Sequence, residues 1–86
     1  MIFSYRQRPM RFLVPDHIRY IDLYGVLYYM PWEEFLPGRS VFLKTTATAR
    51  MVQRKLKPAE VFLSIALRAH ARHEFGYYGV RVWRVG

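Results

Sequence analysis

The sequence predicts a small α+β domain in which one mostly antiparallel β-sheet packs on one or two helices. Two observations point to this fold class. Runs of β-branched and aromatic residues fill the first half of the chain and return at its end, whereas a stretch with helical spacing lies between them. With 86 residues, 52% of them apolar, the chain has material for one hydrophobic core, so we expect residues 1–86 to form a single domain.

The N-terminal residues favour strand. Two short β-favouring runs, residues 2–6 and 10–14, are separated by Arg8-Pro9. A proline in a strand belongs at an edge or a turn. We therefore expect residues 1–14 to form an N-terminal arm or hairpin.

Two further strands are predicted on either side of Gly25. Residues 18–24 alternate, with Ile21 and Leu23 on the same side, and residues 26–30 continue with β-type residues. Gly25 then forms a tight turn or a bulge.

A single helical turn is predicted next. Pro31 suits the first position of a helix, two glutamates follow in its first turn, and Pro37-Gly38 ends it. Residues 39–44 then return to strand.

The residues after this strand predict a helix over residues 47–56. Thr45 or Thr46 can cap its N-terminus. The expected buried stripe has spacings of three and four and consists of Ala49, Val52 and Leu56.

A second helix is predicted over residues 59–74. Pro58 suits its first position, and Gly76 ends it. The last run, residues 79–85, alternates and has the composition of a strand.

The charge of the chain indicates an acidic partner. Fourteen Lys+Arg against six Asp+Glu give a formal net charge of +8, and eleven of the fourteen cations are arginine. The planar guanidinium fork matches phosphate and carboxylate groups. Nucleic acid and an acidic protein surface are therefore the two partner classes that we expect.

Several classes of protein are excluded or disfavoured. The chain has no cysteine, which excludes disulfides, thiolate nucleophiles and cysteine zinc sites. No apolar run approaches the roughly 20 residues that span a bilayer, and the first residues lack the pattern of a secretory signal. We expect a protein of the cytoplasm with no membrane partner.

A basic ridge is predicted on the first helix. Arg50, Arg54 and Lys57 are spaced i, i+4 and i+7, opposite the apolar stripe. Such a ridge can follow a phosphate backbone, or it can simply be a solvated helix face. No acidic residue occurs between Glu34 and Glu60, which favours binding.

Five further arginines are candidate binding residues. Arg6, Arg8 and Arg11 interleave with aromatic residues, as in arms that enter a nucleic-acid groove, although they can instead protect an edge strand. Arg81 and Arg84 alternate with apolar residues of the closing strand. There, an exposed arginine beside a tryptophan can bind single-stranded nucleic acid, unless the tryptophan is in the core.

Tyrosine is abundant, with seven residues, and a core of this size does not readily bury so many hydroxyl groups. Some tyrosines should be exposed, which also suits a protein–protein interface. A symmetric homodimer would bury part of this aromatic surface.

One cluster resembles an active site. His70, His73 and Glu74 can converge at the end of the second predicted helix and hold a metal, or support metal-independent RNA cleavage. The plain interpretation is that cations gather at a helix C-terminus. We predict no metal, no cofactor and no catalytic residue.

A short pattern runs through residues 32–85. Trp32 is followed by Gly38, by Ser-Val-Phe at residues 40–42 and by Gly-Val-Arg-Val-Trp-Arg at residues 79–84. This order resembles small phage-encoded accessory proteins with a W…G-x-S-hydrophobic-F…G-V-R-V-W-R pattern. The resemblance implies a viral protein that works by binding, and it assigns no activity.

Three function hypotheses follow. The first is a small, non-enzymatic protein that engages DNA or RNA through an arginine-rich surface. The second is a phage inhibitor, of the anti-CRISPR or polymerase-inhibitor type, that docks on an acidic surface of a host protein. The third and weakest is a toxin-like ribonuclease.

Overall fold

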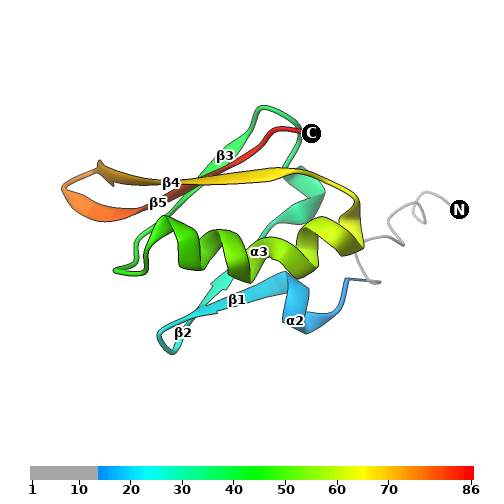
Figure 1. Cartoon of the computed structure of the whole chain (residues 1–86), viewed down its shortest axis with the longest axis horizontal. Helices are drawn as coiled ribbons and strands as arrows, with labels where there is room; N and C mark the ends of the chain where they lie inside the picture. Colours follow the sequence, from blue (N-terminus) through cyan, green and yellow to red (C-terminus); the bar gives the residue numbers. More distant parts are fainter. Residues whose placement is uncertain (1–13) are drawn as a thin grey trace, which may run out of the picture.

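The computed structural model describes residues 14–86 and confirms an α+β domain (Figure 1). Most of the predicted N-terminal arm, including Arg6, Arg8 and Arg11, lies outside the described residues. The elements follow in the order α2 (Asp16–Arg19), β1 (Tyr20–Leu23), β2 (Val26–Tyr29), η2 (Trp32–Glu34, a 3-10 helix), β3 (Ser40–Leu43), α3 (Ala49–Leu63), β4 (Leu67–Glu74) and β5 (Tyr77–Arg84).

The strands form two antiparallel sheets. β1 and β2 make a two-stranded hairpin, and the second sheet has the order β3-β5-β4, with β5 in the middle. Helix α3 lies between the two sheets and contacts both β4 and β1 (Figure 1). The Tyr28 hydroxyl of the hairpin donates to the Lys44 carbonyl oxygen just after β3, which ties the sheets together.

The core lies where α3 faces the two sheets. Its members are apolar and almost fully inaccessible, as the period-2 and period-3.6 patterns require. The hairpin contributes Ile21 and Leu23, and α3 contributes Val52, Leu56 and Ala59. The three-stranded sheet contributes Leu43, Leu67, Val80 and Val82.

The hairpin agrees largely with its prediction. Ile21 and Leu23 are buried on one side of β1, and Gly25 forms the tight turn with φ +83°, preceded by Tyr24 at φ 55°. Two successive residues with positive φ match the twist of a two-residue hairpin loop. The strand begins two residues later than predicted, because residues 16–19 form the helical turn α2.

Helix α3 starts and ends later than predicted. Thr48 is the cap, and its hydroxyl oxygen accepts from the Met51 amide at 3.1 Å. The helix continues through Pro58, so the predicted break there is wrong. Pro58 is exposed, and the bond that it deletes is the one to the carbonyl oxygen of Arg54.

The predicted second helix is wrong beyond residue 63. Ser64 ends α3 in the left-handed conformation with φ 55°, and residues 67–74 form strand β4 instead. β4 pairs with β5 along its whole length, from Leu67 opposite Arg84 to Glu74 opposite Tyr77. This ladder supplies hydrogen bonds and buried contacts that outweigh the local helix propensity of the alanines.

A partly buried ion pair holds α2 against η2. Arg19 is 8% exposed and donates to both carboxylate oxygens of Glu33, at 2.8 Å and 2.5 Å, and to the Met30 carbonyl oxygen at 3.2 Å. The hydrogen bond to Glu33 raises the pKa of Arg19. The Trp32 indole donates to the Ile18 carbonyl oxygen at 3.0 Å and fastens the same two segments.

Within residues 14–86, no helix combines the length and the apolar character that crossing a membrane requires.

Candidate nucleic-acid interface

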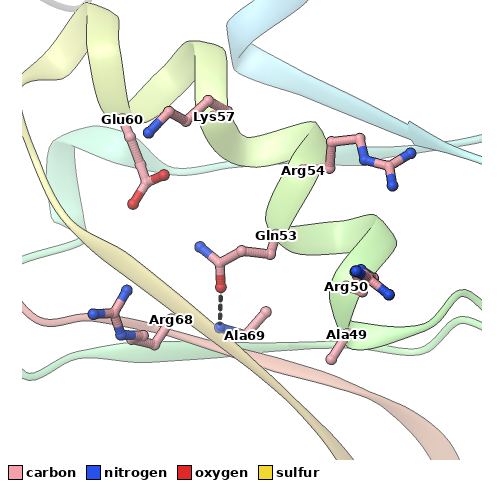
Figure 2. A pocket seen from close by; sticks show the side chains of 8 residues that line it. All are labelled: Ala49, Arg50, Gln53, Arg54, Lys57, Glu60, Arg68 and Ala69. Carbon is pink, nitrogen blue, oxygen red and sulfur yellow. Dashed lines mark hydrogen bonds between the residues drawn. The ribbon is translucent and has the colours of Figure 1, made fainter.

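The three residues of the predicted basic ridge lie together on α3 and are all exposed (Figure 2). They line an open groove of about 640 Å³ between α3 and the edge strand β4. We call it the basic groove. It is lined by Ala49, Arg50, Gln53, Arg54, Lys57, Glu60, Arg68 and Ala69.

The floor of the basic groove is held by α3 side chains bonded to the free edge of β4. The Gln53 amide donates to the Leu67 carbonyl oxygen at 2.8 Å and accepts from the Ala69 amide at 2.9 Å, the second bond being drawn in Figure 2. The Glu60 carboxylate accepts from the Leu67 amide at 2.8 Å. These side chains satisfy backbone groups of β4 that a neighbouring strand would otherwise bond, and they fix the distance between helix and sheet.

The basic groove carries an excess of positive charge, with four cations against one carboxylate. Among residues 14–86, the ion pairs join Glu33 to Arg19 and Glu74 to Arg72 and Arg81, so none involves a cation of the groove. Glu60 is the one acid in its lining, and a carboxylate oxygen of it is occupied by a backbone amide. The groove is therefore an electrostatic site for an anion.

The cations are spread rather than convergent. Figure 2 shows Arg68 on β4 on one side of the groove, whereas the Arg54 guanidinium extends from α3 away from that strand. Such a spread suits successive negative charges along an extended ligand better than one small anion.

The three-stranded sheet has an outer face, opposite α3, with a mixed basic and aromatic surface. In the register, Phe42, Arg81 and His70 lie side by side across the three strands, and Trp83 lies between Ser40 and Arg68. Their neighbours Leu43, Leu67, Val80 and Val82 point to the opposite face and are buried.

The two predicted arginines of β5 have different environments. Arg81 lies on the outer face and donates to Glu74, with the closest contact at 2.6 Å, and to the Ser40 hydroxyl at 2.8 Å. Arg84 points to the other face and donates to the Gly86 and Phe35 carbonyl oxygens at 2.8 Å and 3.2 Å. Arg84 thus connects the end of β5 to the loop after η2.

The Glu74–Arg81 pair predicts a pH effect. Hydrogen bonds from Arg81 lower the pKa of Glu74 in the folded state, with smaller contributions from the charges of Arg81 and Arg72. A lowered folded-state pKa means that the pair's contribution to stability is present above the ordinary glutamate pKa of 4.5 and is lost as the pH falls through the folded-state value.

We therefore expect the Glu74 carboxyl carbon, followed by NMR, to titrate below its ordinary midpoint, and Arg81→Gln to move the midpoint upward. Arg72→Gln is the matched control and should move it less, because the Arg72 Nε atom lies 3.6 Å from the carboxylate. Equal midpoints in wild type and Arg81→Gln would show that the pair is not formed.

The predicted histidine cluster is not assembled. His70 and Glu74 lie on the outer face of β4, whereas His73, at an odd position of the same strand, points to the other side. Residues 14–86 contain no group of three or more His, Cys, Asp or Glu side chains able to hold a metal ion.

Sequence reasoning missed three cations near these surfaces, namely Lys44, Arg68 and Arg72. For Arg68 and Arg72 the signal was available in Leu67–Glu74, where arginine and histidine alternate with leucine and alanine. A period of two places the cations of such a run on one face of a strand. The alanines of this run also fit a helix, and the helix was predicted.

Comparisons with models of protein families, with curated proteins and with solved structures found no match to this chain.

Proposed function

We propose that this protein binds nucleic acid, with the phosphate backbone held in the basic groove. One observation carries the proposal: Arg50, Arg54 and Lys57 of α3 and Arg68 of β4 line one groove, and none of them has an ion-pair partner among the described residues. The phosphates of a polyanion would supply the negative charges that pair with these four cations.

The shape and chemistry of the basic groove support a polymer as the ligand. Three of its four cations are arginines, whose fork binds phosphate through two parallel hydrogen bonds. Its floor is fixed by Gln53 and Glu60, so little ordering of the protein is needed when the ligand binds. The overall charge of +8 attracts the polyanion from a distance.

The proposal is tested by fluorescence polarisation with labelled duplex DNA, single-stranded DNA and RNA over a series of salt concentrations. We expect Arg54→Glu to weaken binding about tenfold and Arg50→Glu/Arg54→Glu about a hundredfold, since each charge-assisted hydrogen bond contributes roughly 1.5–3 kcal/mol. The slope of log K against log salt should fall by about 0.7–0.9 for each phosphate that the variant no longer neutralises.

Arg39→Glu is the matched control. Arg39 is exposed and precedes β3, at the sheet edge opposite β4. Its replacement by glutamate changes the net charge of the protein by the same amount as Arg54→Glu. It should weaken binding much less than Arg54→Glu. Equal losses of affinity in the two variants would contradict a localised site, and no binding even at low salt would contradict the proposed function itself.

A protein partner is the second candidate, favoured by the outer side of the β1–β2 hairpin. Tyr20, Leu27 and Tyr29 are 42%, 64% and 55% exposed there, and the two tyrosine rings meet edge to face at 5.7 Å. Exposed aromatic surface of this kind is typical of protein interfaces. If no nucleic acid binds, the result would favour an inhibitor that docks on an acidic surface of a host protein.

The ribonuclease hypothesis gains no support, since His70 and His73 lie on opposite faces of β4.

A further inference from the structure

The outer face of the β3-β5-β4 sheet carries aromatic rings that the fold does not bury. Phe42 and Trp83 are partly exposed, Tyr77 is 49% exposed, and Phe75, in the turn between β4 and β5, is 77% exposed. α3 covers the opposite face of this sheet (Figure 1). Large exposed rings collected on one sheet face indicate a binding surface rather than chance exposure.

The Phe42 ring is held in place on this face. Its tip occupies the space that a side chain at Gly79 would fill, because an ideal Cβ at that position would lie 2.5 Å from Phe42 Cζ. Phe75 packs edge to face against it, with ring centroids 5.9 Å apart. A ring fixed in this way loses little freedom when a flat ligand stacks beside it.

Cations lie beside the rings. Three of them are within reach of cation–π attraction: the Arg72 guanidinium carbon is 5.5 Å from the Trp83 ring centre, that of Arg81 is 5.7 Å from the Phe42 ring centre, and the Lys44 ammonium is 3.7 Å from the Tyr77 ring centre. The acid on this face, Glu74, is already paired with Arg81. Arg81 and Arg72 share this carboxylate, whereas Lys44 and Arg68 have no ion-pair partner among the described residues and can face phosphates beside the rings.

This face joins the basic groove through Arg68. In the register, Arg68 lies opposite Trp83 on the outer face, and it also lines the basic groove. One ligand can therefore pass from the sheet face over the edge of β4 to α3 without leaving positively charged surface. Along β5, the distance from Trp83 to Tyr77 is about 20 Å at roughly 3.3 Å per residue, enough for a few nucleotides.

We infer that the outer face is a stacking surface for the unpaired bases of a single-stranded nucleic acid, whose backbone continues into the basic groove. This inference rests on the proposed function and narrows its ligand. Bases within a duplex are stacked on one another and cannot reach the rings, whereas each unpaired base stacked on an aromatic ring contributes about 1–3 kcal/mol.

The test compares three ligands of equal length: a 12-mer of deoxythymidine, an abasic 12-mer with the same phosphates, and a 12-base-pair duplex. We expect the thymidine oligomer to bind at least tenfold more tightly than the abasic one and to quench tryptophan fluorescence, since Trp32 is 7% exposed and Trp83 is the accessible indole. Trp83→Leu should abolish most of the quenching.

Phe75→Asn tests the stacking surface without disturbing the core, because Phe75 is mostly exposed and asparagine tolerates its φ of 54°. It should weaken binding of the thymidine oligomer severalfold and leave binding of the abasic oligomer unchanged. Tyr24→Asn is the matched control: Tyr24 is 65% exposed and holds the same turn position, at φ 55°, in the β1–β2 hairpin.

The outcomes separate the inference from the proposed function. Equal affinity for the thymidine and abasic oligomers, or a duplex bound as tightly as the single strand, would overturn the stacking surface and leave the basic groove as a phosphate site. Failure of all three ligands to bind at low salt would overturn both the stacking surface and the proposed function. The aromatic face would then be a candidate surface for a protein partner.

Discussion

Gly79→Ala is expected to lower the free energy of unfolding by about 3 kcal/mol, at the upper end of the range for overpacked sites. Gly79 is in β5, the middle strand, and is buried. A Cβ there would meet the Leu43 carbonyl oxygen and the Phe42 ring. The ring can rotate away, but the carbonyl belongs to the β3–β5 ladder and can move only if the strands separate.

The unfolding free energies of wild type and Gly79→Ala should be compared by urea denaturation followed by circular dichroism. Gly86→Ala is the control for the generic effect of replacing glycine, because Gly86 is exposed, lies outside the strands and its Cβ would meet a side-chain carbon, Ala66 Cβ at 3.3 Å, instead of backbone. That variant should stay within about 0.5 kcal/mol of wild type. A Gly79→Ala protein as stable as wild type would mean that Phe42 and β3 do not pack on β5 as described.

Glu33→Ala is expected to cost about 2 kcal/mol, below the roughly 3–5 kcal/mol for breaking a fully buried pair, because the Glu33 side chain is 20% exposed. The variant leaves the Arg19 guanidinium, 8% exposed, without the two carboxylate oxygens that now accept from it. Among the acceptors that Arg19 keeps, the Met30 carbonyl oxygen and the Tyr29 hydroxyl are more distant and uncharged. The cost therefore comes mainly from the loss of the Glu33 carboxylate by a guanidinium that stays largely buried.

Glu34→Ala is the matched control for this prediction. Glu34 is the next residue of the same 3-10 helix, has the same charge and is exposed. Its replacement should change the unfolding free energy by less than about 0.5 kcal/mol. Similar values for Glu33→Ala and Glu34→Ala in thermal and urea denaturation would show that the Arg19–Glu33 pair does not hold α2 against η2.

The sequence predicted the strands better than the helices, for physical reasons. Strands β2, β3 and β5 are rich in β-branched and aromatic residues, so local preference and final structure agree. β4 is different, since Leu67–Glu74 is built from alanine, arginine, histidine and glutamate, which tolerate a helix. Its conformation is decided by pairing with β5, an interaction that no local window contains.

The candidate site was also predictable only in the part that local spacing determines. Helical spacing alone placed Arg50, Arg54 and Lys57 on one ridge, and the structure has them together along the basic groove. The contribution of Arg68 depends on β4 lying beside α3 and could not follow from spacing. The same is true of the outer face, where a β3–β5 register that spans half of the chain places Phe42 and Trp83 on one side of the sheet.

The position of β5 in the middle of the sheet affects how the chain folds during synthesis. β3 and β4 both bond to β5 and not to each other, yet β5 follows both of them along the chain. At about 5–20 residues per second, β3 waits several seconds for its partner while residues 44–76 are made. Until then the nascent chain can form the β1–β2 hairpin and α3, but the sheet can assemble only after β5 has left the ribosome.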